Sequence, residues 1–298
     1  MFNEKTVLIT GGTGSFGKKF IQRISKEYNP KKIIVFSRDE FKQSNMQKEF
    51  DYPNIRFFLG DVRDKERLNQ AFQGVDIVIH AAALKQVPAL EYNPTEAIKT
   101  NVQGAVNIVD AAIACGVQRV VGLSTDKAVN PVNLYGATKL CMEKVFMSAN
   151  SYNKTHFSCV RYGNVIGSRG SVIPYWQELI SKGIKELPIT DTDMTRFWLT
   201  LDEAVDLVYT AVGSCDLHKI FVPDIKAMPM WAMAKAVCPE SEMVIVGTRP
   251  GEKKHEILIS EDNRDVVKVS NGIIEFNPAV FCSCGCEQYT IEQMRELI

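Results

Sequence analysis

Short apolar runs rich in β-branched residues alternate with amphipathic stretches through the first half of the chain. Such runs, when bounded by turn residues, predict buried strands. Six of them lie at Lys5–Thr10, Lys31–Phe36, Ile55–Gly60, Val75–Ala82, Gln118–Ser124 and Phe157–Arg161. Helical periodicity fills the intervals up to about Lys26 and at Asp64–Phe72, Pro94–Cys115 and Gly136–Ala149. This alternation predicts an α/β fold with a doubly wound parallel sheet.

The regular alternation ends after about Gly163. Prolines, short apolar runs and short helical patterns follow it, and they indicate a smaller and less regular unit. We therefore predict a sheet domain over residues 1–163 and a second domain over residues 164–298. We expect the segment at about 190–215 to return to the first domain.

The charge balance narrows the class of partner. The chain has 35 basic and 35 acidic residues, so no net field draws it toward nucleic acid or a membrane surface. No apolar run approaches the roughly 20 residues of a membrane span, and the first residues lack the pattern of a signal peptide. We expect a cytoplasmic protein with a small-molecule partner, and neither a nucleic-acid nor a membrane partner.

A glycine-rich turn joins the first predicted strand to the first helix. Gly11 would permit the tight turn, Gly14 the approach of a pyrophosphate, and Gly17 close packing of helix on strand. Glycine also serves tight turns for steric reasons alone, but this position favours a dinucleotide at the helix N-terminus. The sheet domain is then of Rossmann type, and its cofactor contacts should include Thr13, Ser15 and Phe16.

The end of the second predicted strand bears on the identity of the dinucleotide. Ser37 and Arg38 suit a ribose 2′-phosphate, so NADP is favoured, with Asp39 and Lys42 nearby. Asp39 could instead contact an NAD ribose, so NAD stays an alternative. A further alternative is that these residues form only a solvated charged loop. Asp61 and Val62 follow the third strand, where an adenine would sit.

Two motifs carry candidate chemistry. Tyr135 and Lys139 are four residues apart and so share a helix face. A nearby ammonium favours a phenolate, which could take a proton from a sugar hydroxyl. Thr125, Asp126 and Lys127 follow the fifth predicted strand, at the edge of the sheet that carries ligands in such folds. The alternative for these three residues is a turn with a helix cap.

The segments TGGTGSFG, HAAALKQVP, STDKAVNPVNLYGATK, RYGNVIGSRGSVIP and RPGEK together resemble the extended short-chain dehydrogenase/reductase family. Within it, the chain is similar over about residues 3–260 to the inverting UDP-N-acetylglucosamine 4,6-dehydratases of pseudaminic acid biosynthesis. Retaining dTDP-glucose 4,6-dehydratases look like Asp–Glu at the place of Asp126 and Lys127, so Lys127 here takes the position of that Glu. Tyr135 separates the chain from fucosamine-type relatives, which often lack that tyrosine.

The resemblance implies a dehydration with inversion at C5, in which a hydride passes from C4 to tightly bound NADP and returns at C6. Tyr135 would take the 4-hydroxyl proton, with Lys139 beside it and Thr125 hydrogen-bonded to the reacting hydroxyl. Lys127 would take the C5 proton as a neutral amine, so we expect its pKa to be depressed. Asp126 would protonate the departing 6-hydroxyl. The roles of Asp126 and Lys127 are the least determined part.

The resemblance also implies the substrate and cofactor contacts, and a closed homo-oligomer, often a hexamer. Ala81 and Lys85 would line the cofactor site, with Lys85 also near the sugar. UDP-N-acetylglucosamine would be held by Asn164, Arg196, Arg249 and Glu252, which makes residues 164–298 mainly a substrate-binding domain. For Lys85 and each arginine the alternative is a plain surface charge.

Three cysteines, Cys282, Cys284 and Cys286, stand close together near the C-terminus. Zinc sites usually have four ligands and CxxC spacing, and His255 could be a fourth ligand only if the fold brings it close. We expect free thiols in a variable tail and no metal. Two other functions stay open, namely a UDP-sugar 4-epimerase and a non-catalytic NADP-sensing protein of the same fold.

Overall fold

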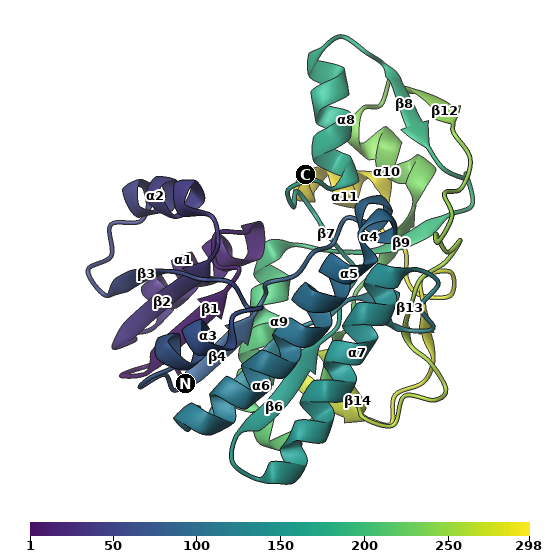
Figure 1. Cartoon of the computed structure of the whole chain (residues 1–298). Coiled ribbons are helices and arrows are strands. Elements are labelled where there is room, and N and C mark those ends of the chain that lie inside the picture. Colours follow the sequence, from purple (N-terminus) through teal and green to yellow (C-terminus); the bar gives the residue numbers. More distant parts are fainter.

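The structure is a computed structural model that describes residues 1–298. Its centre is one large sheet in the order β15-β14-β10-β6-β5-β4-β1-β2-β3, parallel except for the last hairpin, β14 with β15 (Figure 1). The strands are β1 (Thr6–Thr10), β2 (Lys32–Ser37), β3 (Ile55–Leu59), β4 (Ile77–His80), β5 (Arg119–Leu123), β6 (His156–Val160), β10 (Ile220–Pro223), β14 (Val266–Ser270) and β15 (Ile273–Phe276). The six predicted strands and the α/β class are confirmed.

Helices cover both faces of this sheet, as the apolar strands require (Figure 1). On one face α1 (Ser15–Glu27) packs against α9 (Leu201–Gly213), and on the other α6 (Gly104–Cys115) packs against α3 (Lys65–Ala71) and α7 (Leu134–Ala149). Every residue of β1 and β4 is buried. These layers enclose the main hydrophobic core.

The predicted helix at Pro94–Cys115 is interrupted. It begins as α5 (Pro94–Ala97), continues as the π-helical turn η1 (Ile98–Gln103), and ends as α6. The Asn101 side chain lies in this turn and bonds the backbone N–H and carbonyl of Leu84, both at 2.9 Å. A π-turn inside a helix often marks a functional region, and this one fixes the segment that follows β4.

The sequence pattern missed two helices, α2 (Glu40–Glu49) and α4 (Val87–Tyr92). Only Gln43 and Met46 of α2, and only Leu90 of α4, are buried. Helices with so little buried surface leave no apolar stripe in the sequence.

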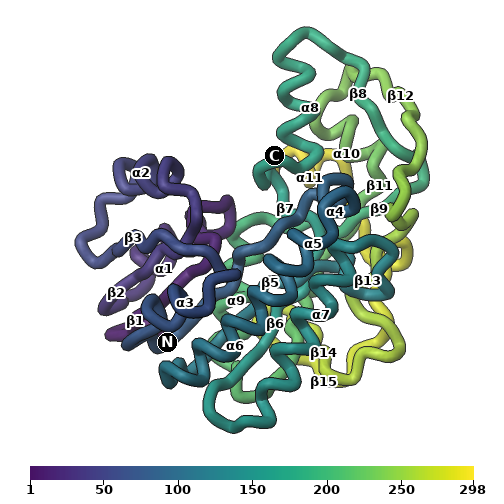
Figure 2. Tube along the Cα trace, viewed as in Figure 1, coloured from purple at the N-terminus to yellow at the C-terminus, as the bar shows by residue number.

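A second lobe stands above the carboxyl ends of the strands and has its own core around Trp176, Trp198 and Met233 (Figures 1 and 2). Its helices are α8 (Val172–Ser181), α10 (Met230–Val237) and α11 (Ile291–Leu297), and its strands are β7 (Asn164–Val165), β8 (Glu186–Ile189), β9 (Thr195–Leu199), β11 (Ala227–Pro229) and β12 (Glu242–Ile245). The 3-10 turn η2 (Asp126–Ala128) contacts β13 (Ile257–Ile259), which pairs with β16 (Phe281–Cys282). The turns η3 (Asn150–Tyr152) and η4 (Cys215–Leu217) complete the set.

The chain crosses between the two lobes more often than the sequence pattern indicates. α9 lies within the segment 190–215 and contacts β5 and β6. The strands β10, β14 and β15 also join the central sheet, although they come from beyond residue 163. The assignment of residues 1–163 to cofactor binding and of residues 164–298 mainly to substrate binding therefore stays a prediction. None of the helices combines the length and the hydrophobicity that a membrane span requires.

Candidate active site

The glycine-rich turn has the geometry that its spacing predicts. Gly11 has φ +66°, and a Cβ there would lie 2.9 Å from the backbone of Ala82. A Cβ on Gly17 would lie 2.5 Å from the Cα and carbonyl oxygen of Gly12. Gly14 is the N-cap of α1, and no side chain caps that helix. The turn therefore leaves the first N–H groups of α1 available to an anionic ligand.

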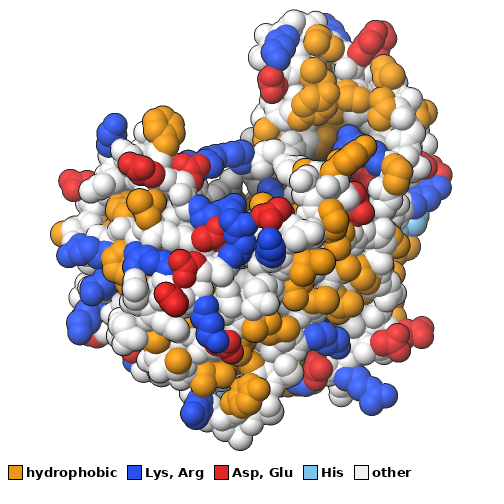
Figure 3. Space-filling view, viewed as in Figure 1, with side chains coloured by type: hydrophobic (Ala, Val, Ile, Leu, Met, Phe, Trp, Pro, Cys, Tyr) orange, Lys and Arg blue, Asp and Glu red, His pale blue; other side chains and the backbone are white.

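A cavity of about 620 Å³ opens beside this turn. Its lining unites the turn with the ends of β2, β3 and β4, and includes Gly11, Thr13, Ser37, Arg38, Asp39, Lys42, Asp61, Val62 and Ala82. Half of the predicted cofactor residues thus border one space, while Ser15 and Phe16 lie in the first turn of α1 and Ala81 directly follows β4. Figure 3 shows charged side chains gathered around the hollow between the lower body and the upper lobe.

Polar contacts at the end of β2 bear on the choice of cofactor. Asp39 caps α2 by accepting a hydrogen bond from the Lys42 N–H at 2.9 Å, and its other oxygen pairs with the Lys42 ammonium. Arg38 is half exposed and lies 3.3 Å from Asp61. Asp39 and Arg38 are therefore both engaged by protein groups, and both line the cavity.

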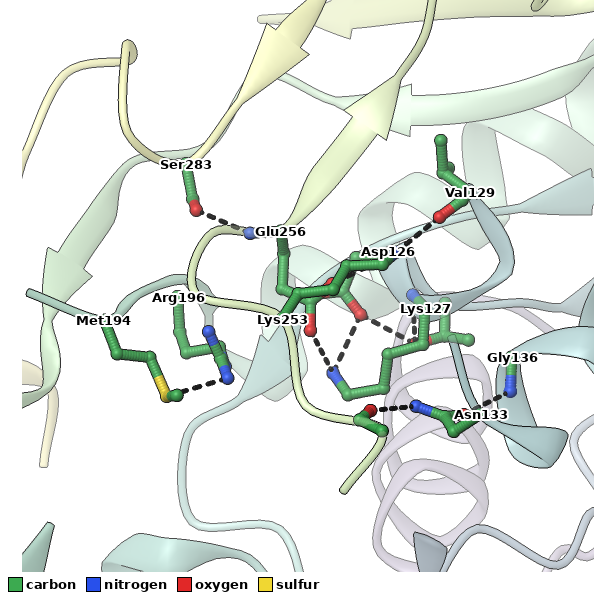
Figure 4. A network of polar contacts seen from close by, with 12 residues as sticks. Asp126, Lys127, Val129, Asn133, Gly136, Met194, Arg196, Lys253, Glu256 and Ser283 are labelled. Carbon is green, nitrogen blue, oxygen red and sulfur yellow. Dashed lines mark hydrogen bonds and ion pairs between the residues drawn. The ribbon is translucent and has the colours of Figure 1, made fainter. Parts of the chain in front are cut away.

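Asp126 and Lys127, two of the candidate catalytic residues, follow the carboxyl end of β5, and Figure 4 shows them beside Glu256 and Lys253. Asp126 is fully buried, and its Oδ1 accepts hydrogen bonds from Thr125 Oγ1 at 2.8 Å and Lys127 Nζ at 3.0 Å. Its other oxygen, Oδ2, has no partner. Tyr135 reaches the same cluster from the start of α7, since Lys127, Asp126 and Thr125 all influence its pKa.

The protonation states differ from those expected. Burial alone would lower the pKa of Lys127, but the carboxylates of Asp126 and Glu256 outweigh it, and the pKa is raised. The prediction of a depressed Lys127 pKa is therefore wrong for this arrangement. The guanidinium of Arg196 also acts to lower the pKa of Lys127, but the two carboxylates act more strongly.

The phenol of Tyr135 shows a related difference. Burial raises its pKa, while the charge of Lys127 and the nearby Thr125 hydroxyl act to lower it. The expected lowering is therefore wrong, and the cation that acts on this phenol is Lys127. Lys139 is buried and lies 3.4 Å from the Met142 sulfur, and burial lowers its pKa to about 8.

The predicted substrate residues lie around this cluster at different depths. Arg196, on β9, is buried and donates hydrogen bonds to the carbonyls of Thr195 and Lys254. Lys85 donates a hydrogen bond to the Arg169 carbonyl at 3.0 Å. Asn164 lies half buried on β7. The exposed Arg249 and the half-buried Glu252 form one turn of the loop after β12, where the Arg249 N–H donates to the Glu252 carboxylate at 3.0 Å.

The structure adds two charged residues that the sequence analysis missed. Glu256 is buried, and its carboxylate lies 3.6 Å from Lys127 Nζ and 3.7 Å from Lys253 Nζ. The two missed residues are Lys253 and Glu256. The sequence feature that could have indicated them is the charged run from Lys253 to Glu256, which begins at the end of the RPGEK motif. A carboxylate next to a buried strand, such as Glu256 before β13, needs a buried cationic partner.

The cysteine-containing segment is no loose tail. β16 pairs with β13, and the Ser283 side chain between Cys282 and Cys284 is fully buried. His255 bonds Thr195 Oγ1 at 2.8 Å rather than turning toward the cysteines. All eight cysteines are free thiols, and no three His, Cys, Asp or Glu side chains form a group suited to a metal ion. β13 and Thr195 therefore hold the segment in place, and its variability among relatives stays a prediction.

Known proteins resemble this chain over most of its length. The family model described as polysaccharide biosynthesis protein matches residues 7–277. A Campylobacter jejuni protein named UDP-N-acetylglucosamine 4,6-dehydratase (inverting) is 51% identical over 94% of this chain and 85% of its own. A Rickettsia canadensis protein named UDP-glucose 4-epimerase is 45% identical over 88% of this chain and 80% of its own. The X-ray structure of Pen from Bacillus thuringiensis is 34% identical, with a TM-score of 0.91, and covers 100% of this chain and 98% of its own. The resemblance indicated by the sequence motifs is confirmed.

Proposed function

The chain belongs to the polysaccharide biosynthesis protein family, and we propose that it is a hydro-lyase acting on UDP-N-acetylglucosamine. The product is a UDP-4-keto-6-deoxy-hexosamine with inverted configuration at C5, and the reaction opens a pathway of the pseudaminic acid type. The same proposal includes a closed homo-oligomer that acts in the cytoplasm. The observation that carries it is the contact of the buried Asp126 with the partly buried Lys127, beside Tyr135 at the carboxyl end of β5.

The cavity beside the glycine turn fits a dinucleotide, because the turn borders it and leaves the first N–H groups of α1 without a side-chain cap. Thr13, Asp61 and Val62 line the cavity with Ser37 and Arg38. We propose NADP, since Arg38 lines this cavity and its guanidinium suits a 2′-phosphate. When bound, this cofactor supplies the acceptor and donor of a hydride.

The chain's own residues then handle the protons. Tyr135 takes the proton of the 4-hydroxyl, and the positive charge of Lys127 and the hydroxyl of Thr125 support its phenolate. Asp126 can take the Lys127 proton across the 3.0 Å contact and donate it from its unpartnered Oδ2 to the 6-hydroxyl, which leaves as water. Lys127 takes the C5 proton, and it must first release its own because the resting site favours the ammonium.

Two arginines are suited to the diphosphate. Neither Arg196 nor Arg249 forms an ion pair with a carboxylate of the protein, so each guanidinium can bind phosphate oxygens. We propose that they hold the nucleotide with Glu252 on the uridine side, and that Asn164 and Lys85 contact the substrate at the mouth of the site.

The direct test is an NMR time course of the purified protein with UDP-N-acetylglucosamine and NADP in D₂O. A dehydratase produces a new C6 methyl signal, deuterium at C5, and ring couplings of the inverted sugar. The similarity to proteins named UDP-glucose 4-epimerase favours one rival, which would form the C4 epimer and no methyl signal. Tight NADPH binding without turnover of any UDP-hexose would instead indicate a sensor. Either result would overturn the proposal.

A further inference from the structure

Glu256 lies directly before β13, with 2% of its surface exposed. Its Oε1 is 3.6 Å from Lys127 Nζ, and its Oε2 is 3.7 Å from Lys253 Nζ. Oε2 has no hydrogen-bond partner. The carboxylate therefore stands between two lysines, and one of them is the proposed base (Figure 4).

The backbone of Glu256 is held by Ser283 of the C-terminal segment. The Glu256 N–H donates to Ser283 Oγ, and the Ser283 N–H donates to the Glu256 carbonyl, both at 2.9 Å. Ser283 Oγ is in turn 2.7 Å from Thr195 Oγ1. A fully buried serine with three such contacts fixes where the glutamate side chain starts.

The charges around the site alternate in sign. Asp126, Lys127, Glu256 and Lys253 follow one another with separations of 3.0, 3.6 and 3.7 Å. Arg196 on β9 also acts on Glu256, and Tyr135 faces Lys127 and Asp126 from α7. A buried charge is costly unless it is paired, so the Lys127 ammonium depends on both carboxylates that flank it.

From this geometry we infer that Glu256 is a positioning residue, which holds the Lys127 nitrogen beside Asp126 and sets the pH at which Lys127 gives up its proton. The inference rests on the proposed function, in which Lys127 is the base. It also assigns a role to the Cys282–Ser283–Cys284 segment, which keeps Glu256 in place through Ser283.

The sign of the effect follows from the charges. Glu256 and Asp126 both raise the pKa of Lys127 against the lowering effect of burial. Replacing Glu256 with Gln removes one negative charge and nearly preserves the shape of the side chain. The pKa of Lys127 should then fall, and the limb of the rate profile that rises with pH should move to lower pH by about one unit or more.

Two readouts test the inference on the full-length protein. The first is the titration of Lys127, followed by NMR in protein labelled with [¹³Cε]lysine and assigned through Lys127→Arg. The second is the pH dependence of C5–H exchange in D₂O. We expect Glu256→Gln to shift both to lower pH, with a reduced maximal rate and a KM within about twofold of wild type. The exposed Glu261→Gln is the matched control and should shift neither.

Two further variants cover a failure of Glu256→Gln to fold. Glu256→Asp keeps the charge but withdraws it by one methylene, and it should shift the Lys127 titration in the same direction by less. Ser283→Ala removes the hydroxyl that holds Glu256 and should do likewise. An unchanged Lys127 titration in folded Glu256→Gln, or in both of these variants, overturns the inference.

The inference and the proposed function can fail separately. If the wild-type protein forms no dehydrated product while Glu256→Gln still shifts the titration of Lys127, the reaction is wrong and the role of Glu256 in holding Lys127 stands. If the product forms and the titration does not move, Glu256 has only a structural role.

Discussion

The glycine turn and the charged cluster around Lys127 are built in different ways. The turn is one continuous stretch between β1 and α1, and backbone geometry at Gly11 and Gly17 determines it. The cluster draws Asp126 and Lys127 from η2, Tyr135 from α7, and Glu256 from the segment before β13. A local backbone motif can be interpreted by itself, whereas the protonation of a buried lysine depends on which distant residues the fold places beside it.

The largest effect that would separate the two regions is expected for Lys127→Ala. Proton transfer by a positioned side chain contributes roughly 10²–10⁴-fold to a rate, so dehydration and C5–H exchange should fall by about that factor. The affinity for NADP should stay unchanged, since the glycine turn is intact. Turnover by NMR and cofactor binding by calorimetry measure the two effects. The exposed Lys182→Ala is the control, and undiminished dehydration by Lys127→Ala would exclude Lys127 as the base.

Gly17→Ala should damage the other region. Its Cβ would lie 2.5 Å from the backbone of Gly12, which is a rigid neighbour. Overpacking of this kind lowers the free energy of unfolding by about 1–3 kcal/mol, and a displaced α1 should also weaken NADP binding. Gly285→Ala is the matched control, because nothing lies within 4 Å of its Cβ position. Equal stability of the two variants in urea unfolding would mean that the turn tolerates side chains.

A third prediction contrasts a buried neutral group with the paired charges. His80, at the end of β4, is buried beside Thr10, and burial lowers its pKa to about 3. The unfolded chain gains a proton near the ordinary value of about 6.5, and the folded protein does so only near pH 3. Stability supplied by the neutral ring is therefore complete above pH 6.5 and is lost as the pH falls.

The expected loss from His80 is about 2 kcal/mol between pH 6.5 and pH 5. Urea unfolding across this range measures the slope, and His80→Asn should have a slope smaller by about one proton. An identical slope in the variant would show that His80 takes no part in the acid sensitivity.

The smallest effect concerns the cofactor. Loss of a charged contact to phosphate costs about 1.5 kcal/mol or more, so Arg38→Ala should weaken NADP binding about tenfold or more and leave NAD binding almost unchanged. Calorimetric titration with both cofactors measures the ratio, and Lys31→Ala, exposed just before β2, is the control. An equal loss for NAD and NADP would contradict a 2′-phosphate contact at Arg38.

The sequence predicted best the elements whose burial produces a clear pattern of apolar residues. Strands such as β1 and β4 are buried throughout and therefore appear as unbroken apolar runs. The short β10 and β14 were missed because they join the sheet after long excursions through the second lobe. The residues of the Asp126–Lys127 pair were predicted from their position after β5.

The electrostatics of the site could not be predicted in the same way. Asp126 and Glu256 together raise the pKa of Lys127, and Glu256 lies far along the chain, directly before β13, which pairs with β16. The role of Ser283 was hidden for the same reason, since a serine between two cysteines gives no sign of its partners. The pairing of β13 with β16 brings Ser283 beside Glu256, which lies beside Lys127, and no pattern of neighbouring residues in the sequence indicates these contacts.

The most direct test of the account uses UDP-N-acetylglucosamine deuterated at C4. Internal transfer predicts that the label leaves C4 and is recovered in the C6 methyl group as CH₂D, in a product with inverted configuration at C5. Recovery of the label at C4 of an epimerised sugar, or a C6 methyl group without deuterium, would contradict the central claim that Asp126, Lys127 and Tyr135 carry out an inverting dehydration.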